Sequence, residues 1–388
     1  MGAILALGMI SMPKANSAQT LRFATFNVSM EASNYQLSRE QPLNPNALFE
    51  YLKNGDHPQI RNIAEIIQRV RPDVILLNEF DFHPDPAVGA GAFLKRYLAV
   101  PQQGAAAIEY PYFYAAPVNT GVPSPWDIDG DGIASGTGAD AYGFGFYPGQ
   151  YGMLLLSRYP INIEKIRTFQ HFLWSAMPEP QTIRHPDGRP FYDQDTWQGL
   201  RLSSKSHWDV PIMVGDTEVH ILAAHPTPPV FDGEEDRNGA RNYDEIRLWA
   251  DYISAEKADY LYDDKGQYGG LGEHPFVILG DYNASAFEGD SRTGAIEQLL
   301  HHPRVNRSII GRSVGGQQHS PEHANSANHT AEWRAQVDYV LPSVTGLIPV
   351  AGGVFWPAKN EDLYRLVAER GVSSDHRLVW LDVQLGQP

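Results

Sequence analysis

An acid and an amide stand two residues apart at the end of an unbroken apolar run, residues 275–279. The run has the length and composition of a buried strand, so Asp281 and Asn283 are expected at the strand's carboxyl end. Alternate strand residues point to the same face, so the two side chains project together if the extended conformation continues through them. The carboxylate could accept a proton or face a cation, and the amide could hold a ligand oxygen. The same tripeptide also suits an Asx turn that closes a strand.

Other apolar strands in the chain end in the same manner. Glu79 follows the buried strand predicted at 74–77, and a carboxylate at the carboxyl edge of a sheet is a natural ligand for a hard metal ion. His225 follows the strand at 218–224, and the prolines after it fix the backbone. Each such residue alone has an ordinary structural explanation, but their repetition indicates a shared site. The whole set is Asn27, Glu79, His225, Asp281, Asn283, Asp338, Asp375 and His376.

The elements that must position these residues alternate between strands and helices. Apolar residues at helical spacing predict helices near 58–71, 246–253 and 295–300. Short strands are predicted at 21–28 and 161–169 among others, whereas 84–140 and 311–328 have the composition of loops. The chain contains no linker, internal repeat or low-complexity tract. We therefore expect a single α/β domain over residues 19–388.

Basic and amide side chains between the strands are candidates for contact with a substrate. Lys205 and His207 lie in a strand-like segment and could meet a phosphate, although polar residues in a strand commonly form its wet face. Arg241 and Asn242 belong to the segment 226–242, which is long, polar and arginine-bearing, and which we interpret as a substrate loop. Lys205, Arg241 and Asn242 are therefore predicted to bind substrate.

Alternating acids in an insertion near 120–145 match the first half of a helix–loop–helix calcium loop. Asp127, Asp129 and Asp131 have the required spacing, and a glycine follows. The second half differs, because Gly138 stands where a bidentate Glu is expected, and Asp140 could close the site instead. Carboxylates this close repel one another without a cation. We predict that the insertion binds structural calcium, and a solvated acidic turn is the alternative.

Composition limits the partners and the location of the protein. The 30 Lys+Arg against 46 Asp+Glu give a net charge of −16, which disfavours long nucleic acid unless a basic groove or bound metal offsets it. The sequence has no cysteine, which excludes disulfides, thiolate zinc sites and cysteine nucleophiles. Residues 1–18 resemble a secretory signal peptide that lacks a basic start, and no segment approaches the ~20 apolar residues of a membrane span. We expect an exported monomer, secreted or periplasmic.

In their order along the chain, the strand-end residues resemble the motifs of the endonuclease/exonuclease/phosphatase superfamily. This superfamily has the metal-dependent fold of deoxyribonuclease I, neutral sphingomyelinases and inositol polyphosphate 5-phosphatases. The resemblance runs from Leu21 to about Val383. Its most specific pieces are Gly280-Asp281-Tyr282-Asn283 and Ser374-Asp375-His376. It implies an α/β fold, a four-layer α-β-β-α sandwich of two packed mixed β-sheets.

The resemblance also implies a divalent metal ion. Glu79 would be the principal ligand of a catalytic Mg²⁺ or Mn²⁺, with Asn27 and Asp375 nearby, and oxygen ligands suit such hard ions. The chain departs from some nuclease members, which carry an acid two residues after the first-strand Asn, where Ser29 stands here. The metal site would then have one carboxylate fewer.

The remaining motif residues would act on the phosphate. Carried over by motif, Asp281 would orient or deprotonate the attacking water, and Asn283 would hold the phosphate. His376, oriented by Asp338, and His225 would bind the phosphoryl oxygens as charge develops on them.

These roles imply a metal-dependent hydrolase of phosphate esters, a phosphodiesterase or phosphomonoesterase, that acts on a small or lipid-like substrate by in-line attack of water. An extracellular nuclease is the alternative. Its chemistry would be the same, but the net negative charge disfavours binding of long nucleic acid. A calcium-stabilised binding protein that has lost the chemistry is a third hypothesis. It would have no need of the full set Glu79, Asp281, Asn283, Asp375 and His376.

Overall fold

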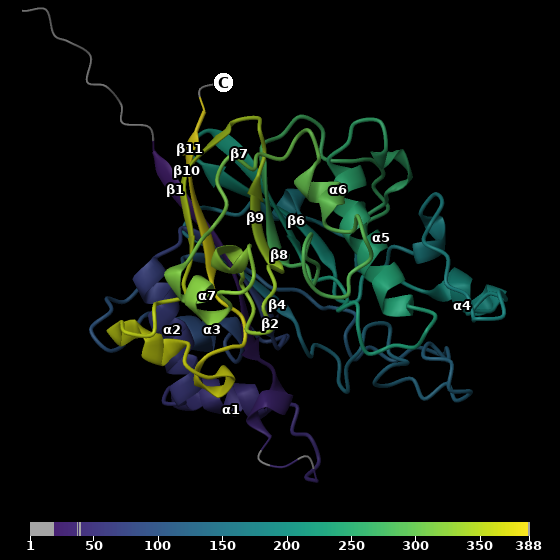
Figure 1. Ribbon diagram of the computed structural model, residues 1–388, viewed down its shortest axis with the longest axis horizontal. Coiled ribbons are helices and arrows are strands. Elements are labelled where there is room, and N and C mark those ends of the chain that lie inside the picture. Colours follow the sequence, from purple (N-terminus) through teal and green to yellow (C-terminus); the bar gives the residue numbers. More distant parts are fainter. Residues whose placement is uncertain (1–18, 37, 39, 387–388) are drawn as a thin grey trace, which may run out of the picture.

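Two β-sheets pack face to face with helices on their outer sides, as the sequence predicts (Figure 1). The computed structural model describes residues 19–36, 38 and 40–386. The predicted signal peptide at 1–18 therefore lies outside the described residues. Among the helices of the described part, none has the length and apolar character needed to cross a membrane.

The first sheet has the strand order β10-β11-β1-β2-β4-β3. β1 and β2 pair in parallel at its centre, and the other described neighbours pair antiparallel. Asn27 and Asn78 are opposite one another in the parallel register, so the carboxyl ends of β1 and β2 lie at the same edge. The strands are β1 (Thr20–Met30), β2 (Val74–Phe80), β3 (Tyr112–Tyr114), β4 (Met153–Ser157), β10 (Leu347–Val354) and β11 (Val379–Leu385).

The second sheet has the order β5-β6-β7-β8-β9. β7 and β8 are parallel and pair Ala224 with Gly280, so His225 and Asp281 follow at the same edge. β9 runs antiparallel to β8 and places Asp338 opposite Asp281. The strands are β5 (Arg167–Thr168), β6 (His207–Val214), β7 (Thr217–Ala224), β8 (Phe276–Asp281) and β9 (Asp338–Pro342).

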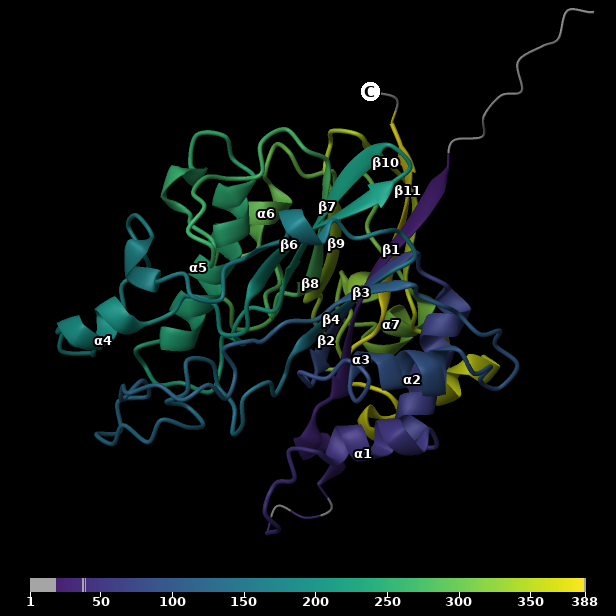
Figure 2. The same ribbon diagram turned by 180° about the vertical axis from the view of Figure 1, so that it is seen from behind.

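Helices cover the outer face of each sheet (Figures 1 and 2). α1, α2 and α3 lie on the side of the first sheet, and α5 and α6 lie on the side of the second. In α2, Ile60, Ile63 and Ile67 are fully buried, and Arg71 ends the helix in the left-handed conformation. The helices are α1 (Ala47–Asn54), α2 (Pro58–Val70), α3 (Ala90–Phe93), α4 (Gln194–Gly199), α5 (Arg237–Tyr252), α6 (Glu297–Leu300) and α7 (Val314–His319).

The second sheet is buried on both faces. Val219, Ile221 and Ala223 of β7 belong to the apolar cluster that includes residues of the first sheet, whereas Leu222 and Ala224 pack with residues of α5. This arrangement explains why the strands that carry the site read as unbroken apolar runs. It also fixes which side chains of β7 face the helices and which face the opposite sheet.

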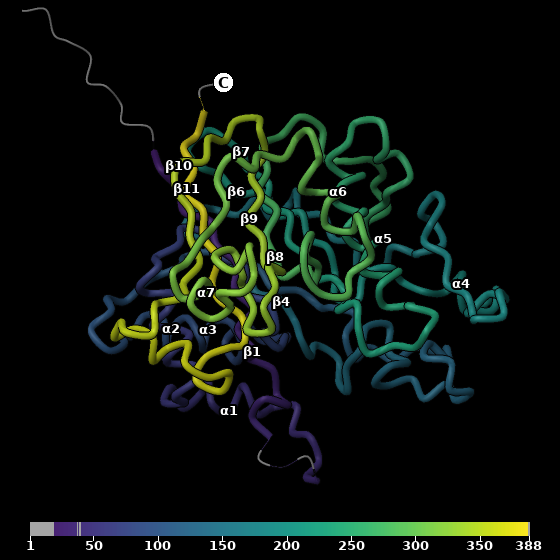
Figure 3. The backbone as a smooth tube through the Cα atoms, viewed as in Figure 1, coloured from purple at the N-terminus to yellow at the C-terminus, as the bar shows by residue number. Residues whose placement is uncertain are grey.

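Three sequence predictions about elements are wrong. The segment 237–242, predicted as a polar loop, is the first part of α5, because buried apolar residues continue the helical pattern back to Ala240. The predicted loop 311–328 contains α7, and the predicted strand at 161–169 shrinks to β5. The tube in Figure 3 shows α5 and α6 side by side to the right of β8.

Candidate active site

The carboxyl ends of β1, β7 and β8 converge on the carboxylate of Asp281. Nδ2 of Asn27 donates a hydrogen bond to Oδ2 of Asp281 over 3.0 Å, which connects the two sheets. Nε2 of His225 and Nε2 of His376 each lie 3.5 Å from the same oxygen. Asp281 is almost fully buried. Three residues that the sequence predicted at separate strand ends thus surround the acid of a fourth.

The two oxygens of Asp281 have different functions. Oδ1 accepts a hydrogen bond of 2.9 Å from the backbone N–H of Asn283, which closes an Asx turn, while Oδ2 faces the site. Asn283 has φ 51°, so the predicted extended conformation ends before it. Nδ2 of Asn283 donates to the carbonyl of Pro226 over 3.1 Å. The turn, and not strand alternation, positions this amide against the loop that follows β7.

His376 is held as a cation. Its Nδ1 lies 2.9 Å from Oδ2 of Asp338, and the edge of the Trp333 ring packs against the imidazole with centroids 4.8 Å apart. Burial opposes the charge, but Asp338 and Asp281 raise the pKa of His376 to about 10. An imidazolium therefore faces the carboxylate of Asp281 at neutral pH.

His225 has the opposite protonation state. Burial lowers its pKa well below the ordinary value, and the neighbouring Lys205 and His376 lower it further. Nδ1 of His225 is buried and has no hydrogen-bond partner among the described residues. Burial also lowers the pKa of Lys205, against the opposing effect of Glu245, Glu79 and Asp281. The charges of Glu79 and Asp281 therefore act on Lys205, and its contact with a substrate stays a prediction.

The predicted metal ligand Glu79 lies close to the other two, Asn27 and Asp375. Glu79 adopts φ 56° at the end of β2. Burial and the charge of Asp375 raise its pKa to about 7, while a hydrogen bond from Asn27 lowers it. Asp375 accepts a hydrogen bond from Ser29 over 3.1 Å and lies 3.3 Å from Arg370. Two carboxylates that repel each other beside an amide form an oxygen donor set that fits a hard divalent ion.

A further carboxylate–imidazole group comprises Asp281, Asp338 and His376, whose ligand atoms lie within 4.8 Å of one another. His376 and Asp338 are already joined by the hydrogen bond between Nδ1 and Oδ2. We therefore interpret this group as one that holds and orients protons, whereas Asn27, Glu79 and Asp375 suit a metal ion.

The family model for the Endonuclease/Exonuclease/phosphatase family matches residues 24–376. The chain belongs to this family. The activities in the family's name all hydrolyse phosphate esters, so the protein belongs to a family of phosphoester hydrolases. Comparison with curated proteins finds no match.

One solved structure shares the fold of this family member, and others are similar at lower TM-scores. The crystal structure of an endonuclease/exonuclease/phosphatase from Beutenbergia cavernae is 17% identical, with a TM-score of 0.51 over 95% of this chain and 72% of that one. Sphingomyelinase C from Streptomyces griseocarneus is 16% identical, with a TM-score of 0.45 over 94% and 99%. The human Nocturnin catalytic domain is 13% identical, with a TM-score of 0.47 over 95% of each chain.

In the acidic insertion near 120–145, three of the four predicted calcium ligands lie together. Carboxylate oxygens of Asp127, Asp129 and Asp140 lie within 4.8 Å of one another. Asp131 is outside this group, and its Oδ1 accepts a hydrogen bond of 2.8 Å from the backbone of Ile133. Asp140, the residue predicted to replace the Glu that is absent at Gly138, is one of these three.

Arg241 and Asn242 hold the loops around the candidate active site, but their side chains do not face it. Arg241 donates to the carbonyls of Leu202, Tyr142 and Arg201. Nδ2 of Asn242 donates to the carbonyls of Thr227 and Tyr282 over 2.8 and 2.9 Å. Both side chains fix loops around the site, and we no longer assign them to direct substrate contact.

The structure also contradicts the prediction that His207 could meet a phosphate. Its Nδ1 lies 2.6 Å from the hydroxyl of Ser203, and its Nε2 lies 2.9 Å from the carbonyl of Glu245. Because both ring nitrogens are bonded within the core, the imidazole has no free nitrogen for a ligand. Burial accordingly lowers its pKa to about 4.

Two positioning residues of this family member escaped the sequence interpretation. Asn78 accepts a hydrogen bond from the backbone N–H of Asp281 over 3.2 Å and donates to the carbonyl of Ala224 over 3.3 Å. Glu245 of α5 accepts 2.6 Å hydrogen bonds from the backbone N–H groups of Ser204 and Thr227. The position of Asn78 directly before Glu79 was a usable signal. Glu245 gave none, because a helical Glu is ordinarily solvated.

Proposed function

We propose that this family member is a metal-dependent hydrolase of phosphate esters with Asp281 as its base. The arrangement around Oδ2 of Asp281 carries the proposal, since Asn27, His225 and His376 all lie within 3.5 Å of that atom. A binding module has no need of a buried acid with three nitrogen neighbours from separate strands. The arrangement suits an acid that must take a proton from a precisely placed water.

The metal ion in this proposal is Mg²⁺ or Mn²⁺. Glu79 would hold it, with the carbonyl oxygen of Asn27 and the carboxylate of Asp375 as further donors. When bound, such an ion polarises the phosphoryl group and neutralises charge that develops on its oxygens. The raised pKa of Glu79 and its repulsion with Asp375 support this assignment.

The side chains around the ion have separate tasks in the reaction. Asp281 orients the water and accepts its proton, and the water attacks phosphorus in line with the leaving oxygen. The imidazolium of His376 and the amide of Asn283 stabilise the phosphoryl oxygens. Lys205 adds a positive charge on the same side, and the neutral His225 contacts Asp281 without neutralising it.

Exposed aromatic residues on the surrounding loops support a small or lipid-like substrate. Phe231, on the loop after β7, is 89% exposed, and Phe287, on the loop after β8, is 68% exposed. Trp333 packs on His376 and is 49% exposed. Exposed aromatic rings, one on His376 and two on loops that follow site strands, fit an apolar group attached to a phosphate better than a polyanion, which the net charge of −16 repels.

A structural calcium ion and export complete the proposal. Asp127, Asp129 and Asp140 would hold the calcium ion, and Asp131 would shape the loop through its bond to Ile133. Secretion or a periplasmic location stays a prediction from the first 18 residues.

One panel of assays tests the proposal. Purified protein is supplied with Mg²⁺, Mn²⁺ or Ca²⁺ and given a phosphomonoester, a bis-aryl phosphodiester, sphingomyelin vesicles and plasmid DNA. Turnover of a monoester, diester or lipid with Mg²⁺ or Mn²⁺, and weak action on DNA, is the expected result. Cleavage of plasmid DNA in preference to all others would support the nuclease alternative. No turnover of any substrate would leave the binding protein as the better hypothesis.

A further inference from the structure

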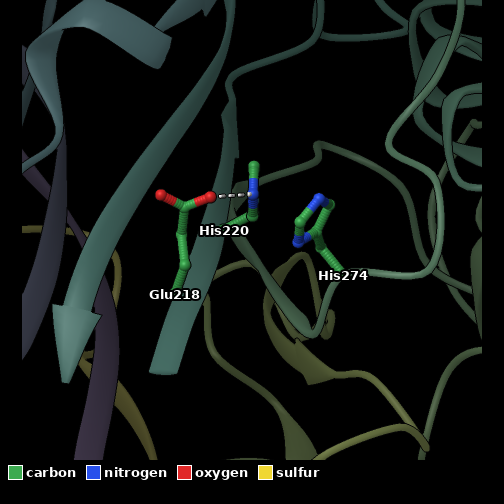
Figure 4. A group of neighbouring side chains, drawn as sticks. All are labelled: Glu218, His220 and His274. Carbon is green, nitrogen blue, oxygen red and sulfur yellow. Dashed lines mark ion pairs between the residues drawn. The ribbon is translucent and has the colours of Figure 1, made fainter. Parts of the chain in front are cut away.

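A second group of histidine and carboxylate side chains lies at the opposite end of β7 and β8 (Figure 4). Glu218, His220 and His274 place one ligand atom each within 4.8 Å of the others. His220 precedes His225 by five residues of extended chain, which at ~3.3 Å per residue separates this group from the active site by roughly 17 Å. The group is therefore independent of the catalytic residues.

The register of the two parallel strands brings these three side chains together. His220 pairs with Phe276, and its backbone N–H donates to the carbonyl of Pro275 over 2.9 Å. Continued two residues back, the same register sets Glu218 opposite His274. Alternate residues of a strand share a face, so the three side chains emerge on the face that packs against α5.

His220 is prepared as a ligand through its Nε2 atom. Its Nδ1 lies 2.7 Å from Oδ1 of Asp209, whose other oxygen accepts a 2.6 Å hydrogen bond from the hydroxyl of Tyr252. A carboxylate at Nδ1 fixes the tautomer with the proton on that nitrogen and leaves the Nε2 lone pair outward, the arrangement found at metal-bound histidines.

That lone pair of His220 has no structural use. The residue is 7% exposed, and its Nε2 is buried with no hydrogen-bond partner among the described residues. The nearest acidic oxygen, Oε1 of Glu218, is 3.6 Å away, which is too long for a hydrogen bond. A buried, unpaired nitrogen that points at a carboxylate and a second imidazole requires a ligand to explain it.

The other two side chains complete a donor set. The exposed ring of His274 lies 4.8 Å from that of His220 between centroids, and its exposure leaves it free to rotate. Burial favours the neutral form of Glu218, but hydrogen bonds from Lys165 and Asn162 hold its pKa below the ordinary value, so it is ionised. Nζ of Lys165 lies 2.9 Å from Glu218, and its side chain is 58% exposed, so it can turn into water when a cation binds.

We propose that Glu218, His220 and His274 bind a zinc ion or a similar transition-metal ion, separate from the catalytic Mg²⁺ or Mn²⁺. Two imidazoles and one carboxylate, with water as the fourth ligand, are a donor set for zinc, whereas Mg²⁺ and Ca²⁺ prefer oxygen alone. Tetrahedral ligands around zinc lie roughly 3.4 Å apart, a spacing that a small rotation of the exposed ring of His274 can bring about. The ion ties the start of β7 to the segment before β8.

Metal titration of the full chain tests this site. The protein is stripped of metal and kept in saturating Mg²⁺ and Ca²⁺, which occupy the oxygen sites. Zn²⁺ binding is followed by calorimetry, and Co²⁺ binding by its visible absorption. His274→Ala should lose one equivalent of each ion, and it should lose the zinc-dependent rise in melting temperature. Lys165→Met should bind zinc a few fold more tightly, because a competing cation is removed.

Two control variants make the result specific. His301→Ala removes an exposed histidine outside these groups and should keep full stoichiometry. His323→Ala alters another cluster, Glu288, His323 and His329, and should also keep the equivalent that His274→Ala loses. The proposal is wrong if His323→Ala loses that same equivalent of zinc. It is also wrong if wild type and His274→Ala bind the same number of zinc ions. The readout is metal binding, so failure of the proposed hydrolase activity does not affect it.

Discussion

His376 near the carboxyl ends of β7 and β8, and His220 near their amino ends, have almost the same geometry and different surroundings. At the carboxyl end, His376 has one carboxylate at Nδ1, 2.9 Å away, and another 3.5 Å from Nε2. At the amino end, His220 has carboxylates at 2.7 Å and 3.6 Å from the same two atoms. Distances alone would give both rings the same function.

The charges around each ring differ. The carboxylates beside His376 raise its pKa to about 10. At His220, one flanking carboxylate, Glu218, already pairs with Lys165, and the exposed ring of His274 lies 4.8 Å away between centroids. Under the two proposals, the partners of the neighbouring acids distinguish a buried histidine that serves as a cation for phosphate from one that serves as a ligand for a metal.

The largest expected effect concerns the carboxyl end. Asp281→Asn keeps the size of the side chain and removes its ability to take a proton, so turnover should fall by ~10² or more. Circular dichroism and the melting temperature check that the variant is folded. Asp290→Asn, at an exposed acid in the same loop, is the matched control and should retain wild-type turnover. Turnover of Asp281→Asn within a few fold of wild type would contradict the assignment.

Glu79→Gln should have the next largest effect. The substitution removes a charge and little volume, so turnover should fall by about tenfold and recover in part at high Mg²⁺ or Mn²⁺ if the carboxylate binds the ion. The measurement is turnover against metal concentration, with the exposed Glu109→Gln as control. An unchanged metal dependence would assign the ion to another ligand.

A third buried histidine extends the comparison to stability. Burial lowers the pKa of His207 to about 4, below the unfolded value near 6.5, so the unfolded state binds the proton more tightly. The stability from neutral His207 is complete above pH 6.5 and is lost as pH falls to 4, on the order of 3 kcal/mol. Urea unfolding at pH 7 and pH 4.5 should show a smaller loss in His207→Gln than in wild type. An equal loss would mean that other groups control acid unfolding.

The smallest expected effect belongs to the calcium insertion. Calcium should raise the melting temperature, because a ligand of the folded state alone adds about 2.7 kcal/mol at a hundredfold excess over its dissociation constant. Asp129→Ala should abolish this shift and leave turnover per folded molecule unchanged with Mg²⁺ or Mn²⁺. If the shift persists in the variant, the loop is a solvated acidic turn. If turnover disappears in a folded variant, the loop belongs to the active site.

The sequence predicted the strand-end residues because each follows a local pattern. Asn27 lies near the end of an apolar strand and His225 and Asp281 close two others, and the parallel pairs β1–β2 and β7–β8 bring such ends to one edge. The layered fold followed from the family resemblance, and the two sheets confirm it. Polar residues that end buried strands are therefore visible before a structure is known.

Contacts set by packing were beyond the sequence. Glu245 binds two loops only because α5 begins at Arg237, where the polar composition indicated a loop. Glu218 and His274 are 56 residues apart, and only the register of β7 on β8 makes them neighbours. Local patterns give residue types and periods, but they do not give register or the depth at which a helix packs.

Because Asn78 reaches from the first sheet to the second, catalytic activity depends on how the two sheets are docked. Its amide on the first sheet holds the backbone of Asp281 and Ala224 on the second, and Asn27 crosses the same boundary. Neither sheet alone contains a complete set of reacting groups. A change that separates the two sheets while it preserves every strand would hardly alter the far-ultraviolet circular dichroism spectrum. It would nevertheless abolish the expected activity. Activity assays would therefore detect slippage between the layers before any spectroscopic measure of secondary structure.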